Sequence, residues 1–314
     1  GTISLIDTTR DEVVGEIKTG GKPRGTAIDT RRGIAYVSDQ ATNGLLVIDI
    51  ARRTVVKRIE LGESPEGVYI SPDGRLVAAA VELSNSVAFI DTGSDEVAFR
   101  VKIRGENPEH AVFSPDGRTL AYRAMARPGF EADRYQIVLM DVQSGQKREI
   151  ASNWDRSADT LQWSRDGQTL YTTAGDVGST KLFAVDTRNG VVTPVTGPGH
   201  VSAFQQTPSG FVFAQDSLKS PSDLYFKTYL GRETPRRLTQ ANPALDAKAF
   251  GEYEQFSFPG WNNETVHGYV IKPVGYEEGK KYPVAFLIHG GPQGSFGDGW
   301  SYRWNPETYA GAGY

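Results

Sequence analysis

The stretch Ser71-Pro72-Asp73-Gly74 recurs along the chain and decides the fold. It returns as Ser114-Pro115-Asp116-Gly117, as Ser164-Arg165-Asp166-Gly167 and, more loosely, as Thr207-Pro208-Ser209-Gly210. The glycines of successive copies are 43, 50 and 43 residues apart. Proline presets φ, and glycine accepts the positive φ that follows, so the stretch predicts a tight turn between two strands.

Two further markers share this period. A Gly-x-x-Pro-type loop has its prolines at Pro23, Pro65 and Pro108, which are 42 and 43 residues apart. An apolar strand that closes on an aspartate also occurs once per period, at Asp7, Asp49, Asp91, Asp141 and Asp186. Recurrence once per repeat predicts that these carboxylates accept hydrogen bonds in turns and do not form a paired acidic site.

Each period contains four short apolar segments separated by turn residues. In one period they are Glu66–Ser71, Arg75–Val81, Asn85–Ile90 and Glu96–Ile103. Four strands in about 42 residues are typical of a β-propeller blade. We therefore expect residues 1–245 to form five full blades and one partial blade, in which Ser4–Asp7 and Glu12–Ile17 are the only strands. The extra residues around Arg123–Arg134 are expected to form a loop.

An open propeller exposes unpaired strand edges, so we expect either another segment to complete the ring or the native gene to be longer. Such open edges, in the propeller or in the part that follows it, are also places where an oligomer could form.

The pattern changes after residue 245. The strands become longer (Glu252–Pro259 and Thr265–Pro273), and the apolar run Tyr282–Ile288 predicts a central buried strand. It leads into His289-Gly290-Gly291-Pro292 and then to Asn305-Pro306-Glu307, a helix start with an asparagine cap. In α/β-hydrolases, a loop of this kind, between a buried strand and a helix, holds an oxyanion-hole donor. The predicted fold class is mainly β: propeller blades followed, over residues 246–314, by the opening strands of an incomplete α/β-hydrolase domain.

From about residue 113 onward the chain resembles the prolyl oligopeptidase superfamily, the S9 serine peptidases, in its dipeptidyl-peptidase 5 and acylaminoacyl-peptidase branch. The resemblance rests on the Phe-Ser-Pro-Asp-Gly phrase at 113–117, the strand Gly268–Pro273, Tyr282-Pro283 and His289–Pro292. It implies a propeller that caps an α/β-hydrolase domain and admits short peptides as substrates. It also implies that the Gly291 N–H is an oxyanion donor, with Gly290 permitting close approach and His289 at the turn.

Residues 1–112 instead resemble YVTN-type propeller repeats. The segments that carry this resemblance are Ser4–Thr8, Ala35–Ser38 and Val47–Asp49. The two resemblances meet at residues 113–117, which indicates that the chain is a mosaic of two families or a fragment. A second interpretation follows: a non-catalytic YVTN-type propeller that binds or scaffolds a partner.

The S9 mechanism needs a serine at a strand-to-helix elbow, an acid and a histidine base. No G-x-S-x-G occurs in the 314 residues, and the nearest matches, around Ser64 and Ser301, lack the final glycine. In the family these groups lie downstream of the position of Tyr314, so we expect this chain alone to be inactive. The alternative for His289–Gly291 is a plain turn.

The remaining titratable candidates have structural interpretations. His267 lies on a strand, His200 lies in a Gly-Pro-Gly turn, and His110 follows the proline of a blade loop. Acidic residues of exopeptidases in this superfamily can hold the α-amino group of a peptide, but a solvated strand face explains the candidates here equally well. Those candidates are Glu109, Glu252 and Glu254.

Composition excludes several other functions. The net charge of −4 disfavours binding to nucleic acid, and no apolar run approaches the length that spans a bilayer. Without cysteine the chain has no thiolate metal site, and its four histidines form no local zinc motif. The glycine-rich run 290–299 is not followed by Lys-Ser/Thr, so it is not a phosphate loop. No cofactor or metal is expected. The compartment stays open, with a periplasmic or secreted location slightly favoured over the cytosol.

Overall fold

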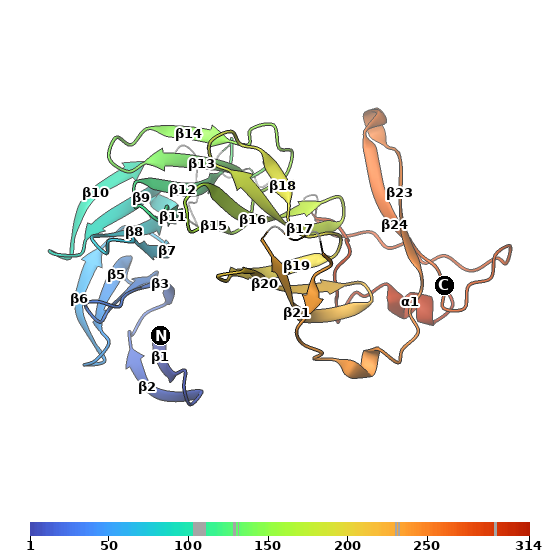
Figure 1. The fold of residues 1–314 in the computed structure, drawn as a ribbon, viewed down its shortest axis with the longest axis horizontal. Helices are drawn as coiled ribbons and strands as arrows, with labels where there is room; N and C mark the ends of the chain where they lie inside the picture. Colours follow the sequence, from blue (N-terminus) through green and yellow to red (C-terminus); the bar gives the residue numbers. More distant parts are fainter. Residues whose placement is uncertain (103–110, 128–129, 131, 230, 232, 292–293) are drawn as a thin grey trace. The chain divides into compact units, whose positions relative to one another are not determined.

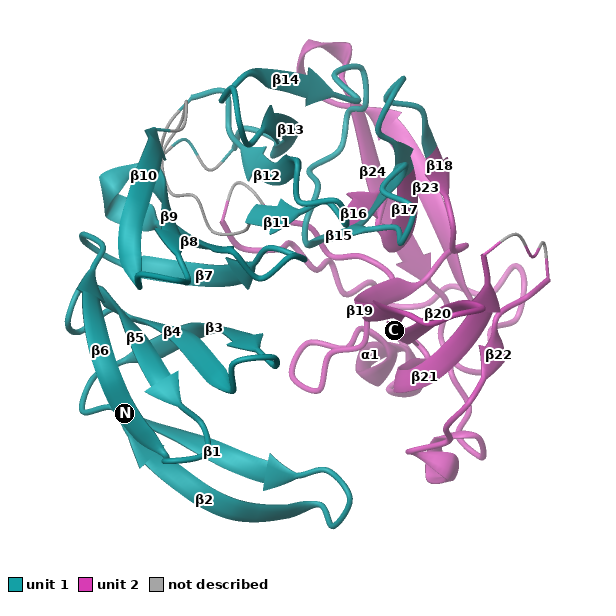
Figure 2. Ribbon diagram, turned by 60° about the vertical axis from the view of Figure 1, so that its left-hand side comes forward, with its two compact units in different colours: residues 1–172, 185–192 teal, residues 173–184, 193–314 magenta. Residues whose placement is uncertain are grey.

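The computed structural model describes residues 1–102, 111–127, 130, 132–229, 231, 233–291 and 294–314. These form two compact units, residues 1–172 with 185–192 and residues 173–184 with 193–314 (Figure 2).

Unit 1 consists of short antiparallel strands in chain order (Figure 1). A hairpin of β1 (Thr2–Asp7) and β2 (Glu12–Lys18) comes first. Three four-stranded sheets follow. The first contains β3 (Pro23–Asp29), β4 (Ile34–Asp39), β5 (Gly44–Asp49) and β6 (Thr54–Glu60). The second contains β7 (Pro65–Ile70), β8 (Leu76–Val81), β9 (Ser86–Asp91) and β10 (Glu96–Lys102), and the third contains β11 (Ala111–Phe113), β12 (Thr119–Ala124), β13 (Gln136–Asp141) and β14 (Lys147–Ile150). A 3₁₀ turn, η1 (Glu82–Ser84), joins β8 to β9.

The next repeat is built from β15 (Leu161–Trp163), β16 (Thr169–Asp176), β17 (Ser179–Asp186) and β18 (Val192–Pro194), and the division between the units passes through β16 and β17. The predicted fold class is confirmed, because successive repeats of about 42 residues each form a four-stranded antiparallel sheet.

The recurring Ser-x-Asp-Gly turn explains the repeat. In the first copy the Ser71 hydroxyl donates to Asp73 Oδ1 at 2.6 Å and accepts the N–H of Leu76 at 2.9 Å, and Gly74 takes φ +69°. The copies at Ser114 and Ser164 repeat these contacts with the same distances. The looser copy differs: Thr207 N–H donates to the carbonyl of Gly210, and Gly210 has no positive φ.

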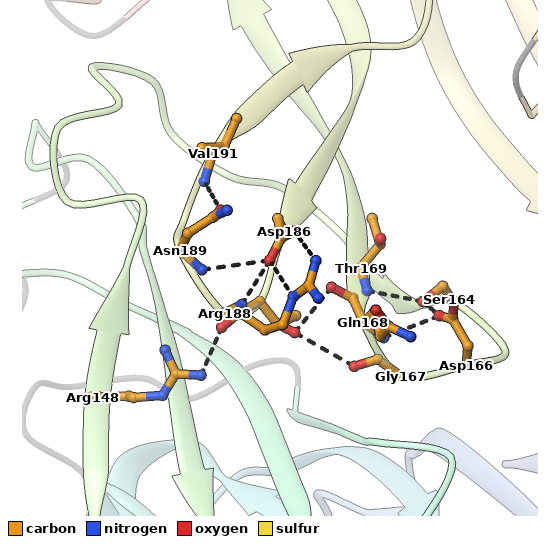
Figure 3. Close-up of polar contacts among 11 residues, drawn as sticks. Arg148, Ser164, Asp166, Gly167, Gln168, Thr169, Asp186, Arg188, Asn189 and Val191 are labelled. Carbon is orange, nitrogen blue, oxygen red and sulfur yellow. Dashed lines mark hydrogen bonds and ion pairs between the residues drawn. The ribbon is translucent and has the colours of Figure 1, made fainter.

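The aspartates that close the strands accept backbone N–H groups two or three residues later, as predicted. The donors are Thr9 for Asp7 (2.9 Å), Arg52 for Asp49 (2.9 Å), Gly93 for Asp91 (3.0 Å), Ser144 for Asp141 (2.7 Å) and Arg188 for Asp186 (2.8 Å). Figure 3 shows the last of these turns, in which the Arg188 guanidinium also donates to Asp186. That bond lowers the pKa of Asp186 to about 2. These carboxylates are turn caps.

The predicted seam at 113–117 lies in the turn between β11 and β12. Phe113, which precedes the turn, packs edge-on against Phe89 of β9 with ring centroids 6.1 Å apart. Phe89 is fully buried and stacks on Phe99 at 4.5 Å. Residues from both sides of the seam therefore share one hydrophobic cluster within unit 1.

Unit 2 contains a sheet of β19 (His200–Gln206), β20 (Gly210–Ser217), β21 (Ser220–Thr228) and β22 (Arg236–Arg237). Strand β17 pairs in parallel with β19 at Thr180 and His200. A separate hairpin follows, made of β23 (Tyr253–Pro259) and β24 (Thr265–Ile271), with the 3₁₀ turns η2 (Pro243–Leu245) and η3 (Trp261–Asn263).

The chain ends with one described α-helix, α1 (Glu307–Gly311). The predicted cap is confirmed, because Asn305 Oδ1 accepts the N–H of Glu307 at 3.0 Å.

One predicted element is wrong. The run Tyr282–Ile288 forms no strand, and the side chains of Val284, Phe286 and Ile288 are 85%, 83% and 74% exposed. A central strand is defined by hydrogen bonds to a strand on each side, and no described residue supplies such a neighbour to this run. Apolar composition alone therefore predicted burial without identifying what would cover the strand.

Candidate functional site

The predicted oxyanion loop, His289–Gly291, lies in unit 2 after this extended run. Gly291 takes φ +71°, in the left-handed region, and both glycines are exposed. The His289 ring meets the Phe296 ring edge-on, with centroids 6.2 Å apart, and His289 Nδ1 lies 3.2 Å from the Gly290 carbonyl oxygen. Among the described residues, none accepts a hydrogen bond from the Gly291 N–H.

Glycine at position 291 is required by backbone conformation and not by lack of space. A Cβ built on Gly291 meets no atom within 4 Å, but the left-handed φ costs an L-residue roughly 1 kcal/mol or more. The loop therefore holds Gly291 in a backbone conformation that glycine favours and that another residue would adopt only at a cost.

The segment Gly297–Trp300, just downstream, is fixed by hydrogen bonds to other parts of unit 2. Asp298 N–H donates to the Gly178 carbonyl at 2.7 Å, and Trp300 N–H donates to Asp216 Oδ1 at 2.8 Å. The buried Asp298 carboxylate in turn accepts the N–H of Leu218 at 3.1 Å and the hydroxyl of Tyr253 at 3.0 Å. We call Asp216 together with the segment 297–300, which includes Asp298, the anchor.

His200 joins the anchor from β19. Its Nδ1 lies 3.1 Å from both carboxylate oxygens of Asp216, and this hydrogen bond raises the pKa of His200 above its ordinary value. Burial raises the pKa of Tyr253, and the charge of Asp298 adds to that shift. The prediction that His200 is structural agrees with these contacts. The sequence did not indicate the anchor, because its members are up to 84 residues apart.

The other predicted candidates have structural surroundings. His267 is exposed on β24. Glu252 pairs with Lys219 at 2.8 Å and Glu254 with Lys272 at 3.6 Å, so these acids are engaged in exposed ion pairs. Their proposed contact with a peptide amine stays a prediction. Glu109 and His110 lie outside the described residues.

The two serines of the incomplete elbow motifs make contacts within loops and turns. Ser64 lies in a loop of unit 1, where its hydroxyl donates to Glu82 at 2.7 Å. Ser301 Oγ accepts the N–H of Trp304 at 2.9 Å in a turn. Both contacts are those of loop residues, as predicted.

Unit 1 carries a polar groove of about 660 Å³. It lies between turns of the β11–β14 sheet and turns of the next repeat, which begins with β15. Its walls include Asp116, Asp166 and Arg148, and Figure 3 shows part of them. Asp116 and Asp166 are held by the serines of their own turns, and Arg148 donates to the Thr187 carbonyl at 2.6 Å. These three side chains of the groove are therefore engaged in turn and loop contacts.

Among the described residues, no group of three or more metal-ligating side chains comes together. No helix among them has the length and apolar character to cross a membrane.

Solved structures establish the class of fold. Hydrazine synthase of Kuenenia stuttgartiensis superposes with a TM-score of 0.60 at 20% identity, over 72% of this chain and 70% of that chain. An acylaminoacyl peptidase of Pyrococcus horikoshii superposes with a TM-score of 0.54 at 17% identity, over 100% of this chain and 59% of that one. At these identities the likeness concerns the fold alone.

Sequence relatives are more specific. Dipeptidyl-peptidase 5 of Arthroderma otae is 41% identical over 204 residues, which is 62% of this chain and 28% of the relative. A probable dipeptidyl-peptidase 5 of Trichophyton verrucosum is 41% identical over 206 residues with the same coverage. No family model matches the chain. The resemblance to the S9 serine peptidases is confirmed, and the chain spans less than a third of the length of these relatives.

Proposed function

We propose that this chain supplies a propeller, residues 1–245, and the opening part of an α/β-hydrolase domain, residues 246–314, to an S9-type serine peptidase that cleaves short peptides. The relatives named dipeptidyl-peptidase 5 support a peptidase at 41% identity. The propeller would restrict the entry of substrates by size, and the hydrolase domain would hold the reacting groups.

Within this proposal, Gly291 donates its N–H to the oxyanion of the tetrahedral intermediate. Two observations carry this role: Gly291 has a φ of +71°, and its N–H has no hydrogen-bond acceptor among the described residues. Such a donor stabilises charge that appears only in the transition state, so it accelerates the reaction without tightening substrate binding. His289 shapes the turn, and Gly290 leaves room for the substrate carbonyl.

The chain as given encodes no G-x-S-x-G elbow, so we propose that residues 1–314 alone are inactive. A fluorophosphonate reagent labels activated serines and tests this directly. We expect no labelling of the 314-residue chain and stoichiometric labelling of the complete gene product, at a serine C-terminal to Tyr314. Labelling of Ser64 or Ser301, or of no residue in the complete product, would contradict the proposal.

The second candidate is a non-catalytic YVTN-type propeller. Its support is the resemblance of residues 1–112, together with curated matches that cover only 62% of the chain. An unlabelled complete gene product would favour it.

A further inference from the structure

The segment 297–300 is held to unit 2 by two buried carboxylates that lie close to one histidine. Asp216 and Asp298 are 9% and 5% exposed, and between them they accept the backbone N–H groups of Trp300 and Leu218 and the hydroxyl of Tyr253. Burying two carboxylates is costly unless hydrogen bonds and a nearby positive charge compensate them. His200, at 3.1 Å from Asp216, is placed to supply that charge.

Three lysines of unit 2 are already paired with other carboxylates. Lys219 pairs with Glu252 at 2.8 Å, Lys272 of the loop after β24 pairs with Glu254 at 3.6 Å, and Lys181 of β17 pairs with Asp176 of β16 at 2.7 Å.

The remaining ionisable groups do not supply a second cation. Burial raises the pKa of Tyr253 and Tyr269, which keeps both neutral near pH 7. Burial also raises the pKa of Glu307 on α1. That carboxylate accepts a hydrogen bond from the Gly251 N–H and lies outside the segment 297–300. His200 is therefore the group whose charge changes next to Asp216 near neutral pH.

The anchor continues into the loop that carries Gly291. Phe296 directly precedes Gly297, and its ring contacts the ring of His289. Gly297 is fixed against the Gly178 carbonyl so closely that a Cβ would come within 2.2 Å of that oxygen. One ring contact thus joins the residue next to the segment 297–300 to His289 of the loop 289–291.

We propose that His200 is a positioning residue whose protonated ring, through Asp216, holds the segment 297–300 and makes the order of the adjoining oxyanion loop depend on pH. The consequence for catalysis rests on the proposed function of Gly291. The pH-dependent anchor does not, because it is a property of unit 2 alone.

The direction of the effect follows from linkage. The pKa of His200 is raised in the folded protein, so its contribution to stability is fully present below the ordinary histidine value of about 6.5. That contribution is lost as the pH rises through the folded pKa. We therefore expect the anchor to be tightest in mild acid and to loosen in mild base.

Amide hydrogen exchange of the 314-residue chain between pH 5 and pH 9 tests the proposal. After correction for the intrinsic pH dependence of exchange, the protection of the Trp300 and Asp298 amides should fall as the pH rises in the wild type. In His200→Gln, which keeps a donor but no charge, the protection should be flat across this range. Asp216→Asn should lower the protection of Trp300 roughly tenfold or more at pH 5.5, the range expected for hydrogen bonds to charged groups. His267→Gln, the same change at an exposed histidine, should behave as the wild type.

Flat protection at Trp300 and Asp298 in the wild type, or an unchanged pH dependence in His200→Gln, would overturn the proposal. If His200→Gln does not fold, NMR titration of the wild type decides the matter, because a His200 pKa no higher than that of His267 also overturns it. None of these measurements reads activity, so a failure of the proposed role of Gly291 would leave their outcome unchanged.

Discussion

Gly297→Ala offers a sharp test of how the loop region is held. A Cβ at position 297 would lie 2.2 Å from the carbonyl oxygen of Gly178, a backbone atom that cannot move aside cheaply. Separating the two by about 1 Å breaks the 2.7 Å bond from Asp298 N–H to that same oxygen. A net backbone hydrogen bond contributes about 0.5–1.5 kcal/mol, and a hydrogen bond to a charged group about 1.5–3 kcal/mol.

Displacing Asp298 also disturbs its carboxylate, which accepts the Leu218 N–H and the Tyr253 hydroxyl. We therefore expect Gly297→Ala to lower the local free energy of opening by about 2–4.5 kcal/mol, the combined loss of one backbone bond and one charged one. Hydrogen exchange at the Asp298 and Leu218 amides measures this value, and urea denaturation followed by tryptophan fluorescence measures the effect on unit 2 as a whole.

Gly299→Ala is the matched control. Its Cβ would come no closer than 3.5 Å to His200 Cγ, an ordinary contact, and Gly299 has no positive φ. We expect a change within about 0.5 kcal/mol, or a small gain because alanine restricts the unfolded chain. Equal exchange in the two variants would refute the claim that Gly297 fixes the segment.

The other predictions concern the blade turns and the acid limit of stability. Ser114→Ala removes the acceptor for the Thr119 N–H and should lower the free energy of unfolding by about 1–2 kcal/mol. Ser144→Ala, in an exposed turn, is the control and should lower it by less than about 0.5 kcal/mol. Equal urea midpoints for the two variants would show that the repeated serine does not hold the turn. The lowered pKa of Asp186 means that its contribution is present above the unfolded value of about 3.9 and is lost as the pH falls toward about 2. Asp186→Asn should therefore reduce the difference between urea midpoints at pH 5 and pH 2, and an unchanged difference would argue against the bond from Arg188.

The parts of the fold that could be read from the sequence are those whose chemistry is local. The Ser71 turn satisfies itself within six residues, so its recurrence at Ser114 and Ser164 predicted the period of the sheets and their strand boundaries to within one or two residues. The strand-closing aspartates and the Asn305 cap were predictable for the same reason.

The parts that could not be predicted depend on distant partners. Residues 282–288 have the composition of a buried strand, but a strand forms only where neighbours exist, and composition does not identify them. The contact of His200 with Asp216 and that of Asp216 with Trp300 join positions 16 and 84 residues apart. No spacing rule links Asp216 to Trp300. His200 and Asp216 are opposite each other in the β19–β20 hairpin, but that register follows only once both strands are known, so the sequence indicated His200 only as a turn residue.

We propose above that the Gly291 N–H stabilises the oxyanion in the complete peptidase. Replacing that single N–H by an ester oxygen isolates this role. Proline is unsuitable as a probe, because its fixed negative φ conflicts with the +71° of Gly291. The ester keeps the φ that glycine allows and removes the donor, although it also makes the Gly290 carbonyl a weaker acceptor. We expect a loss in kcat on the order of 10²–10³-fold, about 2.7–4 kcal/mol, with KM little changed. The same replacement at Gly290 serves as the control and should leave kcat near the wild-type value. An undiminished kcat in the Gly291 ester, in a protein that folds, would show that His289–Gly291 is only a turn.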